Sequence, residues 1–124
     1  MHRILIISDD AQFVSTCTVL EDRGLTLHTT SDFKTVFHDL LNTPFDMVII
    51  NLAEGTEGIN LIKRIRATPQ LSDLPILVTA EWETGYGSLA LSLGATAYEP
   101  TPCDATNLVA AMKRLLKPRL AVAK

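Results

Sequence analysis

Four short polar segments follow apolar runs in this sequence, and they hold the side chains that could do chemistry. They are Ser8-Asp9-Asp10, Asn51, Thr79 and Thr101-Pro102. Carboxylates can hold a metal ion, whereas hydroxyl and amide groups exchange neutral hydrogen bonds. No Lys or Arg stands among these residues. The set therefore favours binding over catalysis.

The remaining residues with catalytic potential are scattered. His2, His28 and His38 fall at the amino terminus, in an expected strand and in an expected helix. Cys17 and Cys103 are far apart and form no metal-binding pattern, so we expect two free thiols. No nearby His or Lys is evident to lower the pKa of Cys103, which disfavours a redox role. We expect no catalytic residues, and therefore no enzyme.

The polar segments must be positioned by the apolar runs that precede them. Ile4–Ile7, Met47–Ile50 and Pro75–Thr79 are continuous apolar runs rich in β-branched residues, which is typical of strands covered on both faces. Leu25–His28 and Ala95–Tyr98 complete a set of five expected strands.

Helical patterns alternate with these strands. The first expected helix runs from Phe13 to Arg23-Gly24. The second is capped by Ser31-Asp32, and its inward residues are Phe33, Val36, Phe37, Leu40 and Leu41. The third carries Ile59, Ile62 and Ile65, and a weaker fourth ends at Gly94. The fifth is capped by Asp104, and its inward residues are Leu108, Met112 and Leu115.

This alternation of strands and helices predicts an α/β fold of five βα units, an open doubly wound parallel sheet. Ligand sites in such sheets lie beyond the carboxyl ends of the strands, so the polar segments should meet at one edge.

The bulk properties describe one globular domain. The chain has 124 residues, 47% hydrophobic and 20% charged, with a net charge of −3. It has no basic cluster for nucleic acid and no apolar run of the ~20 residues that span a bilayer. We expect a cytoplasmic protein, with a domain over residues 1–118 and a tail or linker at 119–124.

Several stretches resemble one known family. Leu74–Ala80, Ala90-Leu91 and Gly94-Ala95, followed by Tyr98, Pro102 and Asp104, resemble the CheY-like receiver domain of bacterial response regulators. The resemblance runs from Arg3 to about Lys117. It implies a flavodoxin-like five-stranded sheet with strand order 2-1-3-4-5, working in a two-component or phosphorelay pathway.

The resemblance also shows where this chain departs from the family. An Asp ends the family's third strand and accepts the phosphoryl group, and Asn51 stands there. The family's metal-binding acidic pair corresponds to Ser8 and Asp9, with Asp10 turned aside, and the family Lys corresponds to Thr101. The resemblance thus implies a pseudo-receiver with no cofactor, in which Mg²⁺ binding at Asp9 is weak or absent.

Other family features are present. Thr79 and Tyr98 match the family's switch residues, and Thr101-Pro102 matches a peptide bond that is often cis. The face formed by the fourth helix, fifth strand and fifth helix docks protein partners or a second copy in the family, and Trp82 and Tyr86 flank it here. We expect protein partners or a homodimer through this face, with no direct nucleic-acid or membrane contact.

Simpler structural roles are open for the same residues. Asp9 and Asp10 suit a solvated turn that caps the first helix, and Thr79 suits a strand end where its hydroxyl meets backbone. Trp82 and Tyr86 suit either local packing or a binding anchor.

The leading hypothesis is a receiver-like module that docks proteins without phosphorylation. One alternative is a functional phosphoreceiver with an atypical acceptor, but Asp46 begins the third strand at the opposite edge and Glu54 lies in a loop. Another is a small-molecule-sensing flavodoxin-like module, although the Gly-x-Gly-x-x-Gly pattern of nucleotide sites is absent.

Overall fold

The computed structural model describes residues 2–18, 25–52 and 57–122. Its elements are β1 (His2–Ile7), α1 (Ala11–Thr18), β2 (Leu25–Thr30), α2 (Val36–Asn42), β3 (Met47–Leu52), α3 (Glu57–Ala67), the 3-10 turn η2 (Pro69–Leu71), β4 (Ile76–Glu81), the 3-10 turn η3 (Trp82–Thr84), α4 (Tyr86–Ser92), β5 (Ala97–Thr101) and α5 (Ala105–Val122). The five strands form one parallel sheet in the order β2-β1-β3-β4-β5. The predicted fold class and strand order are confirmed.

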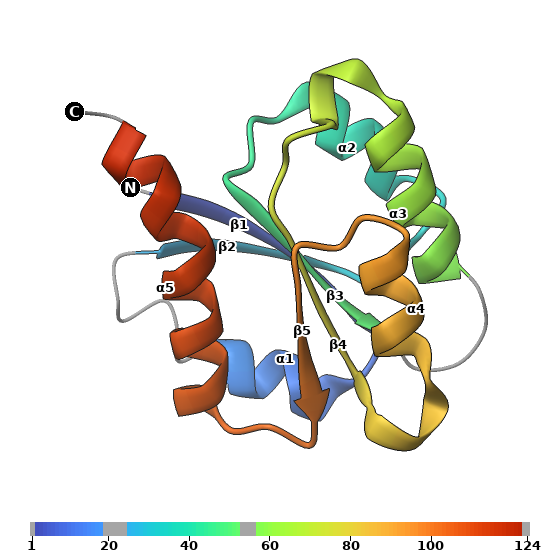
Figure 1. Ribbon diagram of the computed structural model, residues 1–124, viewed down its shortest axis with the longest axis vertical. Helices are drawn as coiled ribbons and strands as arrows, with labels where there is room; N and C mark the ends of the chain where they lie inside the picture. Colours follow the sequence, from blue (N-terminus) through green and yellow to red (C-terminus); the bar gives the residue numbers. More distant parts are fainter. Residues whose placement is uncertain (1, 19–24, 53–56, 123–124) are drawn as a thin grey trace.

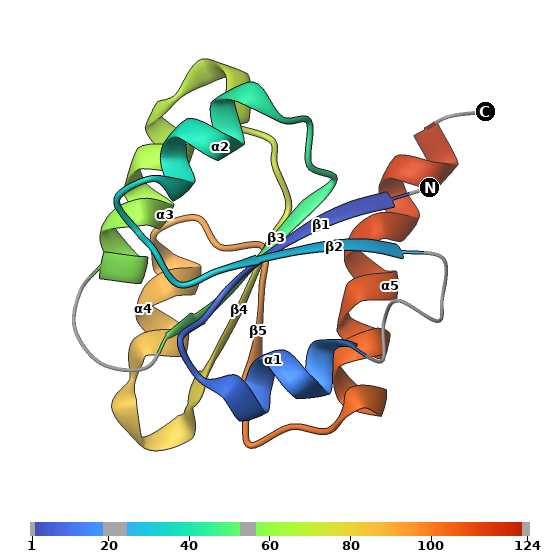
Figure 2. The same cartoon turned by 180° about the vertical axis from the view of Figure 1, so that it is seen from behind.

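The sheet is the middle of three layers. Figure 1 shows α1 and α5 on one face and α2, α3 and α4 on the other, and Figure 2 shows the same arrangement from behind. Successive side chains of a strand point to opposite faces. In β1, Ile4 and Ile6 accordingly join the core cluster under α1 and α5, whereas Leu5 and Ile7 join the cluster under α2 to α4.

The same alternation places the polar residues at the strand ends. Ser8 continues the series of Ile4 and Ile6, Asn51 that of Met47 and Ile49, and Thr79 that of Leu77, and these apolar residues all belong to the cluster under α1 and α5. The three polar side chains therefore project toward the α1 and α5 side at the carboxyl edge of the sheet.

The second helix begins later than expected. The side chain of Asp32 accepts a 2.8 Å hydrogen bond from the backbone N–H of Lys34 and organises a turn, so α2 starts only at Val36. Phe33 precedes the helix and packs against the core as a partly buried residue. The inward placement of Leu41 was wrong, because its side chain is 38% exposed. The later start leaves α2 with seven residues, and its buried residues are Val36 and Leu40.

Strand boundaries also differ from expectation. β5 runs from Ala97 to Thr101 rather than from 95 to 98, and it tolerates Pro100 because it is an edge strand. β4 extends to Glu81. The expected helix end at Arg23-Gly24 lies outside the described residues.

The last helix is capped as predicted but ends later than expected. The side chain of Asp104 accepts a 2.9 Å hydrogen bond from the N–H of Asn107 at the start of α5. Leu108 and Met112 are buried, as is Leu116, whereas Leu115 is only partly buried. The helix continues through Pro118 to Val122, so the tail expected at 119–124 is helical as far as Val122. A proline removes one backbone donor, and the residues after it can still continue the helix.

A partly buried arginine, Arg66, fixes the end of the sheet opposite the polar segments. The guanidinium of Arg66 donates hydrogen bonds to the carbonyls of Gly94 (2.7 Å), Leu74 (2.8 Å) and Ser72 (3.0 Å). It thereby joins the end of α3 to the turn after α4 and to the start of β4. Burial lowers the pKa of this guanidinium, and neighbouring Asp73 opposes the shift.

In the described part of the chain, no helix combines the length and the apolar character needed to cross a membrane.

Candidate functional site

A hydrogen-bonded chain of three neutral side chains crosses the carboxyl edge of the sheet. The hydroxyl of Thr79 donates to Oδ1 of Asn51 at 2.9 Å, and Nδ2 of Asn51 donates to Oγ of Ser8 at 3.0 Å. Thr79 is fully buried and Ser8 is 6% exposed. The chain follows from strand pairing, because Asn51 lies opposite Thr79 and Ile50 lies opposite Ile7, the residue before Ser8. Asn51 thus has both ends of its amide occupied by protein.

The two aspartates after β1 are exposed and differ in their contacts. Oδ1 of Asp10 accepts hydrogen bonds from the N–H groups of Gln12 (2.9 Å) and Phe13 (3.3 Å), which caps the first turn of α1. The N–H of Asp10 donates to Ser8 Oγ at 3.0 Å. Asp10 therefore belongs to the helix start, and both aspartates line the groove described below.

The end of β5 closes the site with uncharged residues. Thr101 is the last residue of the strand, and the Thr101-Pro102 peptide bond is cis. Cys103 follows and is half-buried. Burial raises the pKa of its thiol, and the carboxylates of Glu99 and Asp104 raise it further.

These strand ends surround an open groove of about 850 Å³. Its lining residues are Asp9, Asp10, Gln12, Phe13, Thr16, Phe33, Asn51, Leu52, Glu57, Gly58, Glu81, Thr84, Thr101, Pro102 and Cys103. Carboxylates are the charged groups of this wall, and no Lys or Arg of the described chain lines it. The structure thus brings Asp9, Asp10, Asn51 and Thr101 to one groove, with Ser8 and Thr79 hydrogen-bonded beneath Asn51.

No group of three or more residues of the types His, Cys, Asp or Glu is arranged to hold a metal ion within residues 2–18, 25–52 and 57–122. Asp9 is the carboxylate residue at the predicted metal position. The capping hydrogen bonds at the start of α1 are made by the neighbouring Asp10 and not by Asp9. Mg²⁺ usually binds through one or two carboxylates together with substrate phosphates, and Asp10, Glu57 and Glu81 line the groove beside Asp9.

Tyr98 packs inward between β4 and α4. Its hydroxyl donates a 3.2 Å hydrogen bond to the carbonyl of Ala80, the residue after Thr79. Its ring lies directly over Gly87 of α4, where a Cβ atom would overlap the ring. Desolvation raises the pKa of the phenol, with Glu99 adding to the shift. The close approach of the ring explains why a glycine stands in the first turn of α4.

The two aromatic residues after β4 have different environments. Trp82 lies in η3 and is 71% exposed, whereas Tyr86 is partly buried and packs against the core. Gly85 between them has φ of +75°, a left-handed conformation that favours glycine and separates η3 from α4. Of the predicted partner-face residues, Trp82 is exposed, and Tyr86 and Tyr98 are packed.

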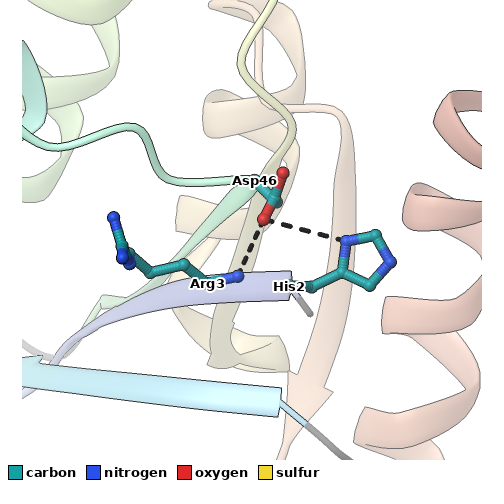
Figure 3. Close-up of polar contacts among 3 residues, drawn as sticks. All are labelled: His2, Arg3 and Asp46. Carbon is teal, nitrogen blue, oxygen red and sulfur yellow. Dashed lines mark hydrogen bonds and ion pairs between the residues drawn. The ribbon is translucent and has the colours of Figure 1, made fainter.

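The alternative acceptor Asp46 lies at the opposite edge of the sheet. Figure 3 shows its Oδ2 atom accepting the backbone N–H of Arg3 at 2.7 Å and lying 3.7 Å from Nδ1 of His2. Asp46 immediately precedes β3, whereas Asn51 lies near the other end of that strand. Asp46 therefore fixes the start of β1 and is remote from the groove. Glu54 lies outside the described residues.

Comparison with known proteins agrees with this architecture. Residues 4–113 match the profile of the family described as response regulator receiver domain. The transcriptional regulatory protein CpxR of Escherichia coli is 29% identical over 119 residues, which cover 94% of this chain and 50% of CpxR. The chain thus spans about half the length of the curated relatives it matches.

Solved structures give the same result. A putative response regulator from Chloroflexus aurantiacus is 26% identical with a TM-score of 0.85, and the match covers 94% of this chain and 98% of that one. The chemotaxis response regulator CheY4 of Vibrio cholerae superposes with a TM-score of 0.82 at 23% identity, over 94% and 99% of the two chains. With its β2-β1-β3-β4-β5 sheet and its match over residues 4–113, the chain belongs to the response regulator receiver domain family of two-component signalling.

Proposed function

We propose that this receiver domain works by docking a protein partner or a second copy of itself, without phosphorylation at the end of β3. The observation that carries the proposal is the amide of Asn51, which is held at both ends by Ser8 and Thr79. An amide is a poor nucleophile, so an acyl phosphate cannot form there as it does on a carboxylate. The hydrogen bonds of this position are satisfied within the protein.

The charges around Asn51 support the same proposal. Phosphoryl transfer depends on cations that offset the charge of the transferring group. Thr101 supplies no charge at the end of β5, and the side chain of Asp10 is engaged at the start of α1. Asp9 alone gives little affinity for a divalent metal ion.

The proposed docking face is formed by α4, β5 and α5 and is flanked by Trp82. Trp82 is 71% exposed, and Leu91 of α4 is 44% exposed. Leu91 lies one turn after Gly87, which contacts Tyr98, so it is on the side of α4 that faces β5. No charged residue occurs between Gly85 and Tyr98. Leu91 thus lies in a segment without charged residues, and exposed aromatic and apolar side chains are typical of the centre of a protein interface.

The groove favours one second candidate, a small-molecule-sensing domain. Its volume of about 850 Å³ falls within the range of roughly 300–1,000 Å³ that ligand pockets occupy. Native mass spectrometry of the purified chain tests the small-molecule-sensing function. A sensor of this kind requires that the chain carry a bound molecule of defined mass.

Sedimentation velocity tests the docking proposal with the second copy as occupant. We expect self-association that is unchanged by Mg²⁺ with acetyl phosphate and is weakened at least tenfold by Leu91→Lys, since a charge would be buried at the interface centre. Lys63→Glu on α3 is the matched surface control, because Lys63 is exposed on a helix outside the face. Association that appears only with the phosphodonor would contradict the proposal.

A further inference from the structure

The two cysteines belong to elements that pack against one another. Cys17 lies on α1, is fully buried and belongs to the core cluster that also contains Phe13 and Leu108 of α5. Cys103 lies in the segment that joins β5 to α5 and is half-buried. Both views of the molecule place this segment beside α1 (Figures 1 and 2).

Three observations bring the segments that carry the two cysteines to one junction of the fold. Cys103 lines the groove together with Phe13 and Thr16 of α1. Phe13 lies one helical turn before Cys17, and Thr16 immediately precedes it. α1 also contacts α5, which begins two residues after Cys103. Burial raises the pKa of the Cys17 thiol, and the negative charge of a Cys103 thiolate raises it further. The two cysteines thus lie on segments that meet at the junction of α1 and α5.

We propose that Cys17 and Cys103 form a redox-active pair that closes to an intramolecular disulfide and joins α1 to the start of α5. Both thiols are free in the structure. The oxidant is a low-molecular-weight disulfide such as oxidised glutathione.

The reaction proceeds by two exchanges. Cys103 is the more accessible thiol, and it loses its proton and attacks one sulfur of oxidised glutathione, which forms a mixed disulfide and releases one glutathione. The Cys17 thiol then loses its proton and attacks the Cys103 sulfur, which forms the protein disulfide and releases the second glutathione. Two protein thiols are oxidised and one glutathione disulfide is reduced to two thiols. Excess reduced glutathione reverses both steps.

The surroundings set the speed of this chemistry. Burial raises the pKa of both thiols, and Glu99 and Asp104 raise that of Cys103 further. Little thiolate is therefore present near neutral pH, and the pair responds slowly to a sustained change in redox conditions. The cross-link would fix the α1 wall of the groove against the Thr101-Pro102 segment.

Intact-mass spectrometry of the whole chain after incubation with oxidised glutathione tests the proposal. The folded chain is expected to lose about 2 Da and both free thiols, with Cys17 and Cys103 recovered in one linked peptide pair. Dithiothreitol should restore the original mass. A Cys103→Ser variant is the matched control and should show no loss of mass, because Cys17 then has no partner.

A chain oxidised in concentrated urea serves as the positive control for the oxidant. The proposal is overturned if the folded native chain keeps both thiols while the urea sample forms the disulfide. It is equally overturned if the folded chain carries only glutathione adducts or links between two chains. The native chain decides the result, so a variant that folds poorly does not affect the conclusion.

Discussion

At the scale of single residues, the carboxyl edge of the sheet is organised by hydrogen bonds between neutral groups. Thr79 donates to Asn51, and Asn51 donates to Ser8, which also accepts the N–H of Asp10. In the described part of the chain, every buried side-chain nitrogen and oxygen has a hydrogen-bond partner. The buried polar side chains of this edge therefore find their hydrogen-bond partners within the protein.

Thr79→Val tests this chain of hydrogen bonds. The substitution keeps the shape of the side chain but leaves the amide oxygen of Asn51 without its donor, which should cost about 1–3 kcal/mol in the free energy of unfolding. In an Asn51→Leu background the same substitution should cost about 1 kcal/mol less, because the acceptor has gone. Urea unfolding of the four proteins measures this coupling.

The control for Thr79→Val is Thr16→Val on α1. The Thr16 hydroxyl bonds to the carbonyl of Gln12 in the same helix and is exposed to solvent, so this change should cost less than about 0.5 kcal/mol. A coupling near zero between Thr79 and Asn51 would mean that their hydrogen bond does not stabilise the edge.

The buried thiol of Cys17 predicts a loss of stability at alkaline pH. Burial raises its pKa to about 12 in the folded state from 9.0. Between these values the unfolded chain releases a proton that the folded chain keeps, so the thiol's contribution is complete below pH 9 and declines as pH rises toward 12. The slope from this group is at most about 1.4 kcal/mol per pH unit.

Urea unfolding under reducing conditions, at several pH values from about 8 to about 10.5, measures this slope. Cys17→Ala should lose stability less steeply than the native chain, whatever the offset between the two curves. If the free energies of unfolding of the two proteins fall with pH at the same rate, the Cys17 thiol has the same pKa in the folded and unfolded states and the prediction is wrong.

Much of this site was predictable at the residue scale. Parallel strands end at one edge, so the apolar runs alone indicated that Asn51 and Thr79 lie close together, and the structure joins them by a hydrogen bond. The bond between Asn51 and Ser8 was not predictable, because it depends on side-chain rotamers and on which end of the amide faces each strand. The contacts of Arg66 were equally hidden, since its partners are mainly backbone carbonyls that carry no sequence signal.

At the scale of elements, α4 is positioned by the packing of Tyr98. The ring covers Gly87, and the phenol bonds to the carbonyl of Ala80 directly after Thr79. β4, β5 and α4 therefore meet at one side chain, which links the neutral hydrogen-bonded chain to the proposed docking face.

Gly87→Ala tests the contact between β5 and α4. The added methyl group would overlap the ring, so the free energy of unfolding should fall by about 1–3 kcal/mol. In a Tyr98→Val background the same change should be neutral or stabilise by up to about 1 kcal/mol, because alanine is the better helix former. Thermal unfolding of the four variants checks the reversal of sign, and equal losses in both backgrounds would exclude the ring as the cause.

Element types were easier to predict than element ends. The sequence pattern predicted the five strands of the sheet, whereas the start of α2 at Val36 and the shift of β5 to Ala97 depend on local turns. Asp32 illustrates the difficulty, because the same side chain that caps helices also stabilises a turn before one. The exposed side chain of Leu41 follows from the short α2 helix that resulted.

At the scale of the whole molecule, the sequence predicted the fold because five strand patterns alternate with helical patterns. Such alternation permits few topologies, and the order β2-β1-β3-β4-β5 is the one that the family resemblance implied. The family match over residues 4–113 agrees with this result. What the domain docks depends on surface chemistry, so Trp82 and Leu91 carry that proposal rather than the fold.

The central claim is that the groove at the carboxyl edge no longer binds Mg²⁺ and a phosphoryl group. Trp82 is the single tryptophan of the chain, and Glu81 and Thr84 on either side of it line the groove, so we use its fluorescence as the readout. The control is a Ser8→Asp, Asn51→Asp, Thr101→Lys variant, which restores the charged groups that the family resemblance implies.

The decisive measurement is a titration of the native chain with beryllofluoride in the presence of Mg²⁺, followed by Trp82 fluorescence. We expect no saturable change in the native chain and a saturable, Mg²⁺-dependent change in the variant with restored charges. A saturable, Mg²⁺-dependent change in the native chain would show that the groove still binds a phosphoryl group, and the proposal of a phosphorylation-independent domain would then be wrong.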